Sequence, residues 1–198
     1  DVDFCVHSLK DLPAVRHART VRAALPSREN PRDVIVWRRD APARLAAGEA
    51  LRVGSSSLRR QGNVAEFLAW ALPAANRPPV VEFVPVRGAV DARLARLQLP
   101  RNGPDALDGV VLALAGLARL WNDPAGRAAV ERPLTAMRWM VLSLRRCSAA
   151  ARQGELAVET ARCGVEGATA FECGVGRTQA RVAQVEHPLR GVAGGCAP

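Results

Sequence analysis

Short apolar runs alternate along the chain with longer amphipathic segments, a pattern typical of strands followed by helices. Apolar runs predict strands over residues 2–6, 34–37, around 53, 80–84 and 110–114. Amphipathic segments predict helices over residues 55–72, 90–99 and 116–121. This alternation favours an α/β fold, with a parallel or mixed sheet covered by helices on both faces. Such folds bind ligands where strands end and helices begin, because helix N-termini present free N–H groups to anions.

Two of the predicted helices carry a clear apolar stripe. The first begins behind a serine cap at residues 55–57, and its stripe consists of Leu58, Val64, Phe67 and Leu68. The second has a stripe of Val90, Leu94 and Leu97. We expect both stripes to be buried against the sheet.

The remaining segments are less regular. Residues 133–150 fit no single element. Residues 155–159 predict a further strand, and residues 178–192 predict a helix that Pro188 would interrupt. The proline- and arginine-rich stretch 26–33 predicts a hinge or a crossing between domains.

The composition indicates a folded protein of one large or two small domains. The chain has 198 residues, of which 48% are hydrophobic, enough to build a core. No run of about 18 apolar residues could span a membrane. The five cysteines are an odd number without a C-x-x-C pair, so they support neither a disulfide framework nor a metal site. We expect a reducing compartment.

Arginine dominates the positive charge. The formal net charge is +9, and Lys10 is the single lysine among the 28 Lys and Arg residues. One interpretation is the bias of a GC-rich genome, and the other is a bound polyanion, because arginine pairs bidentately with carboxylate and phosphate. Net charge alone would favour nucleic acid. However, no basic run exceeds two residues and no aromatic pattern accompanies the basic residues, so we expect no nucleic-acid partner.

A candidate catalytic pair follows the first predicted strand. Within His7–Pro13, Lys10 and Asp11 place an ammonium group beside a carboxylate in a loop that proline closes. The pair could supply a general acid or base next to a charge that holds an anion. An ordinary solvated turn is the alternative, although a lysine in so arginine-rich a chain favours a specific role.

Two later strand ends have the composition of anion cradles. Gly54–Gln61 combines a glycine, three serines, a helix start and the pair Arg59-Arg60. It lacks the spacing of a P-loop, and a capped surface helix with two solvated arginines is the alternative. Arg87–Leu94 repeats the order of strand end, glycine and helix start with arginines. Two such sites suggest a ligand with several carboxylates or phosphates.

A further candidate lies near the end of the chain. In Gly194-Gly195-Cys196 the two glycines predict a flexible and exposed cysteine. Exposed thiols can act as nucleophiles or as attachment points. The motif is weak by itself.

Taken together, these segments resemble the porphobilinogen deaminase family. The motifs that carry the resemblance follow one another in the family's order, at His7–Pro13, Arg28–Asp33, Val53–Gln61, Arg87–Leu94, Asp108–Leu120, Gln153–Glu159 and Gly194–Cys196. The chain departs from the family at Ser55, where threonine is usual, and at Ala89, where asparagine is usual. It also has Ala151-Arg152 in place of Pro-Gly, and Pro198 two residues after the cysteine instead of three.

The resemblance implies a fold of three domains. Two are doubly wound lobes like those of periplasmic binding proteins, with the active site between them. The third is a small α+β domain that bears the cysteine. It implies that residues 1–30 and 151–165 form part of lobe 1, that 31–150 form lobe 2, and that 166–198 begin the third domain.

The resemblance also implies an activity. The family builds a dipyrromethane cofactor on a cysteine, here Cys196, through a thioether. It then joins four porphobilinogen units head to tail with loss of ammonia, and releases hydroxymethylbilane for tetrapyrrole and haem biosynthesis. We expect a cytoplasmic monomer, or a plastid protein in a photosynthetic eukaryote, with neither a nucleic acid nor a membrane as partner.

Individual roles follow from the matching positions. Asp11 corresponds to the catalytic carboxylate, which stabilises positive charge on the pyrrole nitrogens as ammonia leaves. Each pyrrole of the family's substrate carries an acetate and a propionate, which would explain why positively charged residues cluster at the predicted site. The positions that correspond to carboxylate-binding residues are Lys10, Ser55, Ser57, Arg59, Arg60, Arg87, Arg93, Arg119 and Gln153.

Two alternatives to the transferase remain open from the residues alone. One is a non-catalytic anion-binding module of the periplasmic-binding-protein type, and the other is a nucleic-acid-binding protein. Residues 1–198 lack the family's first segment and most of its last domain. We therefore expect low or no turnover from this chain alone.

Overall fold

The computed structural model describes residues 4–15, 17–71 and 80–161. They fall into two compact units. The first unit contains the residues up to Asn30 together with those from Ala151 onward, and the second unit contains Pro31–Ala150. Residues 166–198 and the helix predicted over 178–192 lie outside the described residues.

The first unit is built on a small antiparallel sheet. Its strands lie in the order β1 (Cys5–Ser8), β8 (Leu156–Ala161) and β2 (Thr20–Ala24). A 3₁₀ turn, η1 (Leu9–Asp11), follows β1, and the Leu9 amide donates to the Glu155 carbonyl at 3.0 Å. The strand predicted over 155–159 is confirmed, whereas β2 was not predicted because its five residues show no apolar alternation.

The second unit is built on a mixed sheet of five strands. Their order is β5 (Val81–Val84), β4 (Leu51–Gly54), β6 (Gly109–Ala113), β3 (Asp33–Trp37) and β7 (Arg138–Val141). Strand β4 runs parallel to β5 and β6, whereas β3 runs antiparallel to β6 and β7. The mixed α/β class predicted from the pattern is confirmed.

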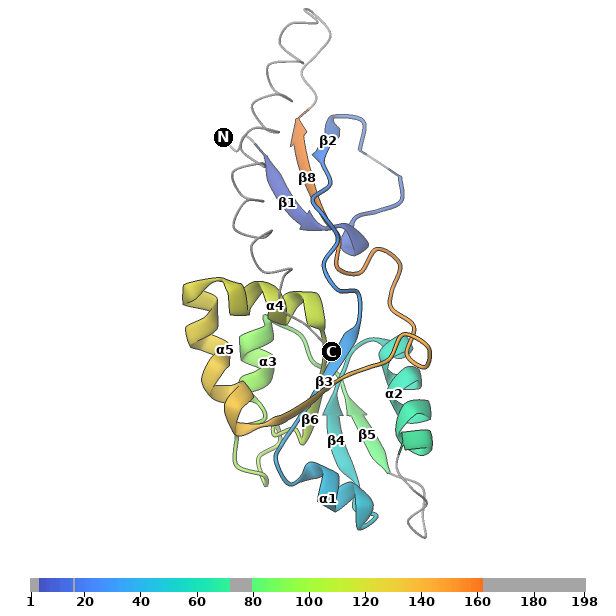
Figure 1. Ribbon diagram of the computed structural model, residues 1–198, viewed down its shortest axis with the longest axis vertical. Helices are drawn as coiled ribbons and strands as arrows, with labels where there is room; N and C mark the ends of the chain where they lie inside the picture. Colours follow the sequence, from blue (N-terminus) through green and yellow to red (C-terminus); the bar gives the residue numbers. More distant parts are fainter. Residues whose placement is uncertain (1–3, 16, 72–79, 162–198) are drawn as a thin grey trace, which may run out of the picture. The chain divides into compact units, whose positions relative to one another are not determined.

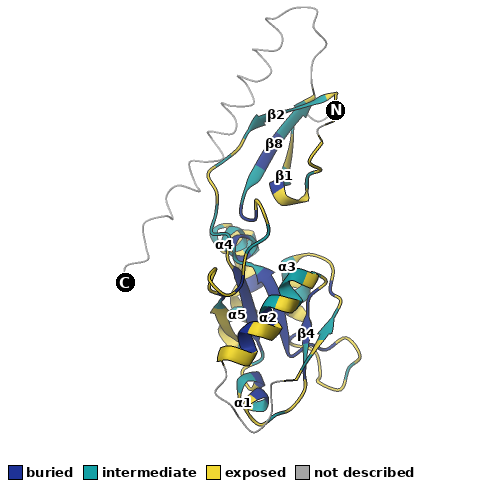
Figure 2. Cartoon of the chain, turned by 90° about the vertical axis from the view of Figure 1, so that its right-hand side faces the viewer, coloured by how far each residue is buried: buried dark blue, intermediate teal, exposed yellow. Residues whose placement is uncertain are grey.

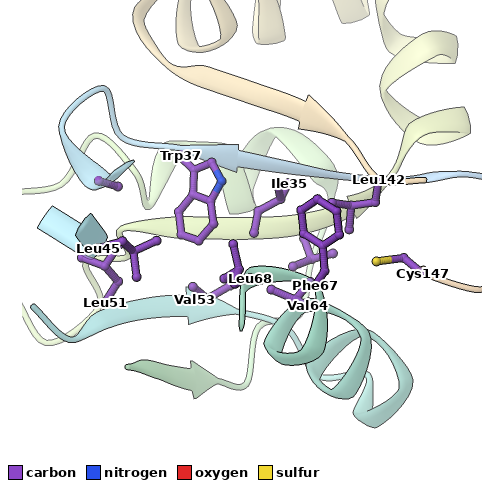
Figure 3. Close-up of a cluster of buried hydrophobic side chains, with 12 residues drawn as sticks. Ile35, Trp37, Leu45, Leu51, Val53, Val64, Phe67, Leu68, Leu142 and Cys147 are labelled. Carbon is purple, nitrogen blue, oxygen red and sulfur yellow. The ribbon is translucent and has the colours of Figure 1, made fainter. Parts of the chain in front are cut away.

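Helices cover both faces of this sheet, as predicted (Figure 1). One face is covered by α1 (Ala41–Ala46) and α2 (Leu58–Ala71), and the other by α3 (Val90–Ala95), α4 (Leu114–Asn122) and α5 (Pro124–Ala136). Successive residues of β3 therefore enter different cores. Ile35 and Trp37 pack with α2 (Figure 3), and Val34 and Val36 pack toward α3 and α5. Because both faces are covered, β3 is buried along its whole length. Figure 2 shows that α2, in contrast, carries both buried and exposed residues.

Most of the two apolar stripes is buried as predicted, although Val90 is half-buried and Leu58 is exposed. Val64 and Leu94 are buried, but Leu58 is 82% exposed. Leu58 is the first residue of α2, and it lies about 120° around the helix from Val64, so it faces solvent. Helix α3 ends at Ala95 and is therefore shorter than the predicted range of 90–99.

Three elements of the second unit were not predicted. They are α1, α5 and β7. The end of α5 and the whole of β7 fall in the stretch 133–150, which fits no single element by its pattern. Helix α5 contains Pro133, which weakens its helical signal. Among the helices that the structure describes, none is long and apolar enough to cross a bilayer.

Two glycines offer a test of the packing in the second unit. Gly109 lies opposite Trp37 in the sheet, and a Cβ added to it would stand 2.5 Å from the indole ring. Gly109→Ala should therefore lower the free energy of unfolding by about 1–3 kcal/mol through overpacking.

Gly62 lies in α2 with nothing within 4 Å of an added Cβ. Gly62→Ala should raise the free energy of unfolding by about 0.5–1 kcal/mol. Urea unfolding measures both, and equal stability of the two variants would contradict this packing.

Candidate functional site

The candidate residues of the second unit follow its parallel strands. Strands β4, β5 and β6 end at Gly54, Val84 and Ala113, and each is followed by a helix. Because neighbouring parallel strands end at one edge of a sheet, the segments that follow them share that edge. Ser55, Ser57, Arg59 and Arg60 follow β4, Arg87 and Arg93 follow β5, and Arg119 lies in α4 behind β6. We call this the carboxyl edge of the second unit.

The three serines build the turn between β4 and α2. Ser55 is buried, its amide donates to the Val84 carbonyl at 2.9 Å, and its hydroxyl accepts from the Ser57 amide at 3.3 Å. The Ser56 hydroxyl accepts from the Val86 amide at 2.9 Å and donates to the Val86 carbonyl at 2.8 Å. Ser56 thus joins the turn after β4 to the turn after β5. Its role was not predicted, because a side-chain bond to a distant backbone leaves no local pattern.

Arg59 and Arg60 converge on one buried carboxylate. Asp33 is 1% exposed. Its Oδ2 accepts from Arg59 Nη2 at 2.9 Å, and its Oδ1 lies 3.0 Å from Arg60 Nε and 2.9 Å from Arg60 Nη2. Asp33 pairs with Ala113 in the sheet, so the antiparallel β3 begins at the carboxyl edge. The sequence pattern did not predict this contact, because it depends on the direction of β3.

The arginines after β5 add to the positive charge of the edge. Arg93 Nε donates to the Gly88 carbonyl at 2.8 Å. Burial lowers the pKa of Arg93, and the positive charge of Arg60 lowers it further. Arg60 and Arg93 therefore lie close enough to repel each other. Arg87 is exposed in the same turn, where Gly88 takes a φ of +99°.

The segment after β7 packs on α2 beside Arg59. Arg59 Nη1 donates to the Ser148 carbonyl, and Asn63 Nδ2 donates to the same oxygen at 3.0 Å. The Arg146 guanidinium lies 4.3 Å from the centre of the Trp70 ring. The Cys147 thiol is buried, and burial, aided by nearby carboxylates including Asp33, raises its pKa. At neutral pH the thiol therefore stays protonated and is a poor nucleophile.

The candidate residues of the first unit gather at one end of its sheet. Lys10 and Asp11 lie in η1, directly after β1, and both are exposed. Gln153 lies in the loop before β8 and is buried. Because β1 and β8 are antiparallel and Ser8 pairs with Leu156, that loop and η1 lie at the same end of the sheet.

Hydrogen bonds connect the loop before β8 to residues 28 and 29 of the same unit. Arg28 Nε donates to the Gln153 carbonyl at 3.0 Å, and the Glu29 amide donates to the Gly154 carbonyl at 3.0 Å. Arg152 has a φ of 60° and Gly154 a φ of 90°. A Cβ on Gly154 would stand 2.3 Å from the Glu29 carbonyl oxygen. Both positions thus adopt the left-handed conformation that favours glycine, and the resembling family has glycine at both.

Two substitutions test this loop. Arg152→Gly should raise the free energy of unfolding by about 0.5–1 kcal/mol, because the left-handed strain of about 1–2 kcal/mol outweighs the added flexibility of the unfolded chain. Gly154→Ala should lower it by about 2 kcal/mol or more, because strain and a backbone clash coincide. Thermal unfolding of both variants measures the difference. A stabilising Gly154→Ala or a destabilising Arg152→Gly would contradict the loop geometry.

Cys196, the candidate attachment point, lies outside the described residues. Of the other candidates, the structure groups Arg59 and Arg60 on Asp33, and it puts Arg93 within electrostatic range of Arg60. Arg119 is half-buried in α4, behind the third parallel strand. The additional residues are Asp33 and Ser56. Two signals were available for Asp33: it ends the family-resembling motif Arg28–Asp33, and it directly precedes a buried apolar run.

Residues 1–166 match the profile of a family described as "Porphobilinogen deaminase, dipyromethane cofactor binding domain". Porphobilinogen deaminase 1 of Streptomyces coelicolor is 43% identical over 120 residues, which cover 61% of this chain and 34% of that protein. The porphobilinogen deaminase of Sorangium cellulosum is 47% identical over 119 residues, which cover 60% of this chain and 34% of that protein. That of Limosilactobacillus reuteri is 35% identical over the same length. The chain thus spans about a third of the length of the curated relatives it matches.

Proposed function

The chain belongs to the porphobilinogen deaminase family, and on this premise we propose that it acts as a hydroxymethylbilane synthase. The reaction joins four porphobilinogen units head to tail. Each condensation breaks the aminomethyl carbon–nitrogen bond of one unit, releases ammonia and forms a carbon–carbon bond to a free pyrrole carbon, which loses its proton. The observation that carries the proposal is the carboxyl edge of the second unit, whose serines and arginines suit a ligand with several carboxylates.

We propose that the two units are doubly wound lobes of the periplasmic-binding-protein type. Parallel strands with helices on both faces support this for the second unit. The division expected from the family is lobe 1 from residues 1–30 and 151–165, lobe 2 from 31–150, and a cysteine-bearing domain from 166 onward. The match to the family does not favour the non-catalytic anion-binding alternative.

The residues of the carboxyl edge fit the dipyrromethane group that the family description names. Each of its pyrroles carries an acetate and a propionate. Burial lowers the pKa of Arg93, and the positive charge of Arg60 lowers it further; bound carboxylates would offset both effects. Attached at Cys196, the group would supply the primer for the condensations.

Each candidate residue then has a proposed task. Arg60, Arg87, Arg93 and Arg119 bind carboxylates of the pyrroles, and Arg59 supports Arg60 on Asp33. The hydrogen bonds of Ser55 and Ser57 within the turn favour a task in shaping the cradle as well as in binding. Gln153 is buried, so its proposed task is to support the loop beside η1.

Lys10 and Asp11 have the proposed chemical roles in the first unit. Both are exposed at the end of β1, so both are accessible to a substrate. The Asp11 carboxylate would stabilise positive charge on the pyrrole nitrogens as ammonia leaves, and could accept a proton. The Lys10 ammonium would hold a carboxylate of the same substrate. Action as a cytoplasmic monomer, without nucleic acid, stays a prediction from the family.

The mass of the intact protein tests the attachment. After production of the full-length protein in cells that make porphobilinogen, it should carry the mass of a dipyrromethane, and Cys196→Ser should remove it. Cys147→Ser, which alters a buried cysteine, should leave the increment in place. An unmodified Cys196 in the unchanged chain would refute the proposal.

Consumption of porphobilinogen tests the catalytic residue. Asp11→Asn should slow ammonia release by about 10²–10⁴-fold, the range expected for loss of a positioned acid–base or charge-stabilising group. Binding of porphobilinogen should change far less, because Lys10 and the arginines remain. Single-turnover ammonia release with enzyme in excess measures even slow chemistry. Equal rates for Asp11→Asn and the unchanged sequence, both measured in the full-length protein, would exclude Asp11 as the catalytic carboxylate.

A further inference from the structure

We propose that Asp33 is a positioning residue, whose buried carboxylate orients Arg60 for a carboxylate of the substrate. This inference rests on the proposed function and adds a residue to it. Asp33 would not touch the substrate. It would act through the guanidinium groups that it holds.

The backbone around Asp33 provides a rigid support. Asp33 begins β3, which lies between β6 and β7. It pairs with Ala113 of β6, and its carbonyl accepts from the Leu142 amide at 2.9 Å. With 1% of the residue exposed, the carboxylate is shielded from bulk solvent. A carboxylate so deeply buried must be paired with positive charge.

The geometry of the Arg60 pair fixes the plane of its guanidinium. Nε and Nη2 both lie within 3.0 Å of Asp33 Oδ1. Since the guanidinium is planar, these two contacts direct Nη1 away from Asp33. The Arg60 side chain is 11% exposed, so few other orientations are open to it. Preorganised donors of this kind lose less entropy when a carboxylate binds.

Arg93 adds a further positive charge near this pair. Burial lowers the pKa of Arg93, and the positive charge of Arg60 lowers it further. Asp33 supplies a negative charge that offsets the repulsion between the two arginines.

Arg59 differs from Arg60 in its hydrogen-bond partners. Its Nη2 donates to Asp33 Oδ2, and its Nη1 donates to the Ser148 carbonyl. It therefore links Asp33 to the segment that packs on α2. The two neighbouring arginines, which are equivalent by sequence, thus divide into one that braces the cluster and one that Asp33 orients toward a ligand.

Removal of the Asp33 charge changes ligand affinity in opposite directions under two explanations: positioning of Arg60, and simple repulsion of the anionic ligand by Asp33. A negative charge beside an anion site repels the anion, so its loss should tighten binding if charge alone matters. If Asp33 positions Arg60, its loss should weaken binding although the site becomes more positive. Asparagine also presents an N–H₂ group, which cannot accept from arginine.

The test is a calorimetric titration with porphobilinogen, in a Cys196→Ser background that excludes attached pyrroles. Asp33→Asn should weaken binding at least 10-fold. The double variant Asp33→Asn/Arg59→Gln restores the net charge of the cluster and avoids an unpaired Arg59. Compared with Arg59→Gln alone, in which Asp33 still holds Arg60, it should show the same loss, and this comparison carries the test if Asp33→Asn alone does not fold.

Asp108→Asn is the matched control. Asp108 is also buried, and its carboxylate accepts from Arg44 Nη1 at 2.8 Å and from the Arg52 amide at 3.0 Å. It directly precedes β6, so it lies at the opposite edge of the parallel strands. Its substitution should lower thermal stability as Asp33→Asn does, but porphobilinogen affinity should change less than twofold.

The outcomes separate the two proposals. Affinity that is unchanged or tighter in folded Asp33→Asn or in the double variant, with Arg60→Ala weakened, would overturn the positioning role and leave the proposed function intact. An equal loss in Asp108→Asn would also overturn it, because the effect would then follow stability. No binding by the Cys196→Ser parent would overturn the proposed function, and this inference with it.

Discussion

A buried carboxylate has to be neutralised, and in the second unit Asp33 meets this requirement with two arginines of α2. This pairing connects several segments of the second unit. It holds the first turn of α2 against the start of β3, and through Arg59 it also holds the segment around Ser148. The serine turn, the helix start and the packed segment after β7 therefore share one electrostatic anchor at the carboxyl edge.

This anchor explains how several cations can gather at one edge before any ligand binds. Arg60 and Arg93 repel each other, and such a cluster would be costly without a counter-charge. Asp33 supplies that charge from within the core. The cations thus stay in place, in an arrangement that suits the proposed polycarboxylate substrate. The arginines of this edge thus meet a local need for planar, bidentate donors.

The departures from the family pattern have structural consequences of different kinds. Arg152 occupies a left-handed position where the family has glycine, so this departure costs stability. The segment after β7 resembles the family little, yet it packs closely through Cys147, Arg146 and the Ser148 carbonyl. Neither departure removes a candidate binding residue of the second unit.

The sequence by itself determined the alternation of strands and helices, the two-sided burial and most candidate positions. Those features depend on local periodicity, as in residues 34–37, and on motifs such as Gly54–Gln61 that are contiguous in the chain. Elements with weak local signals escaped prediction, as β2 and the proline-containing α5 did. Only the tertiary structure decided that β3 runs antiparallel to β6 and so carries Asp33 to the edge where Arg59 and Arg60 begin their helix. The reason is physical: strand direction and the pairing of charges 26 and 27 residues apart depend on long-range packing, which leaves no periodic mark on the sequence.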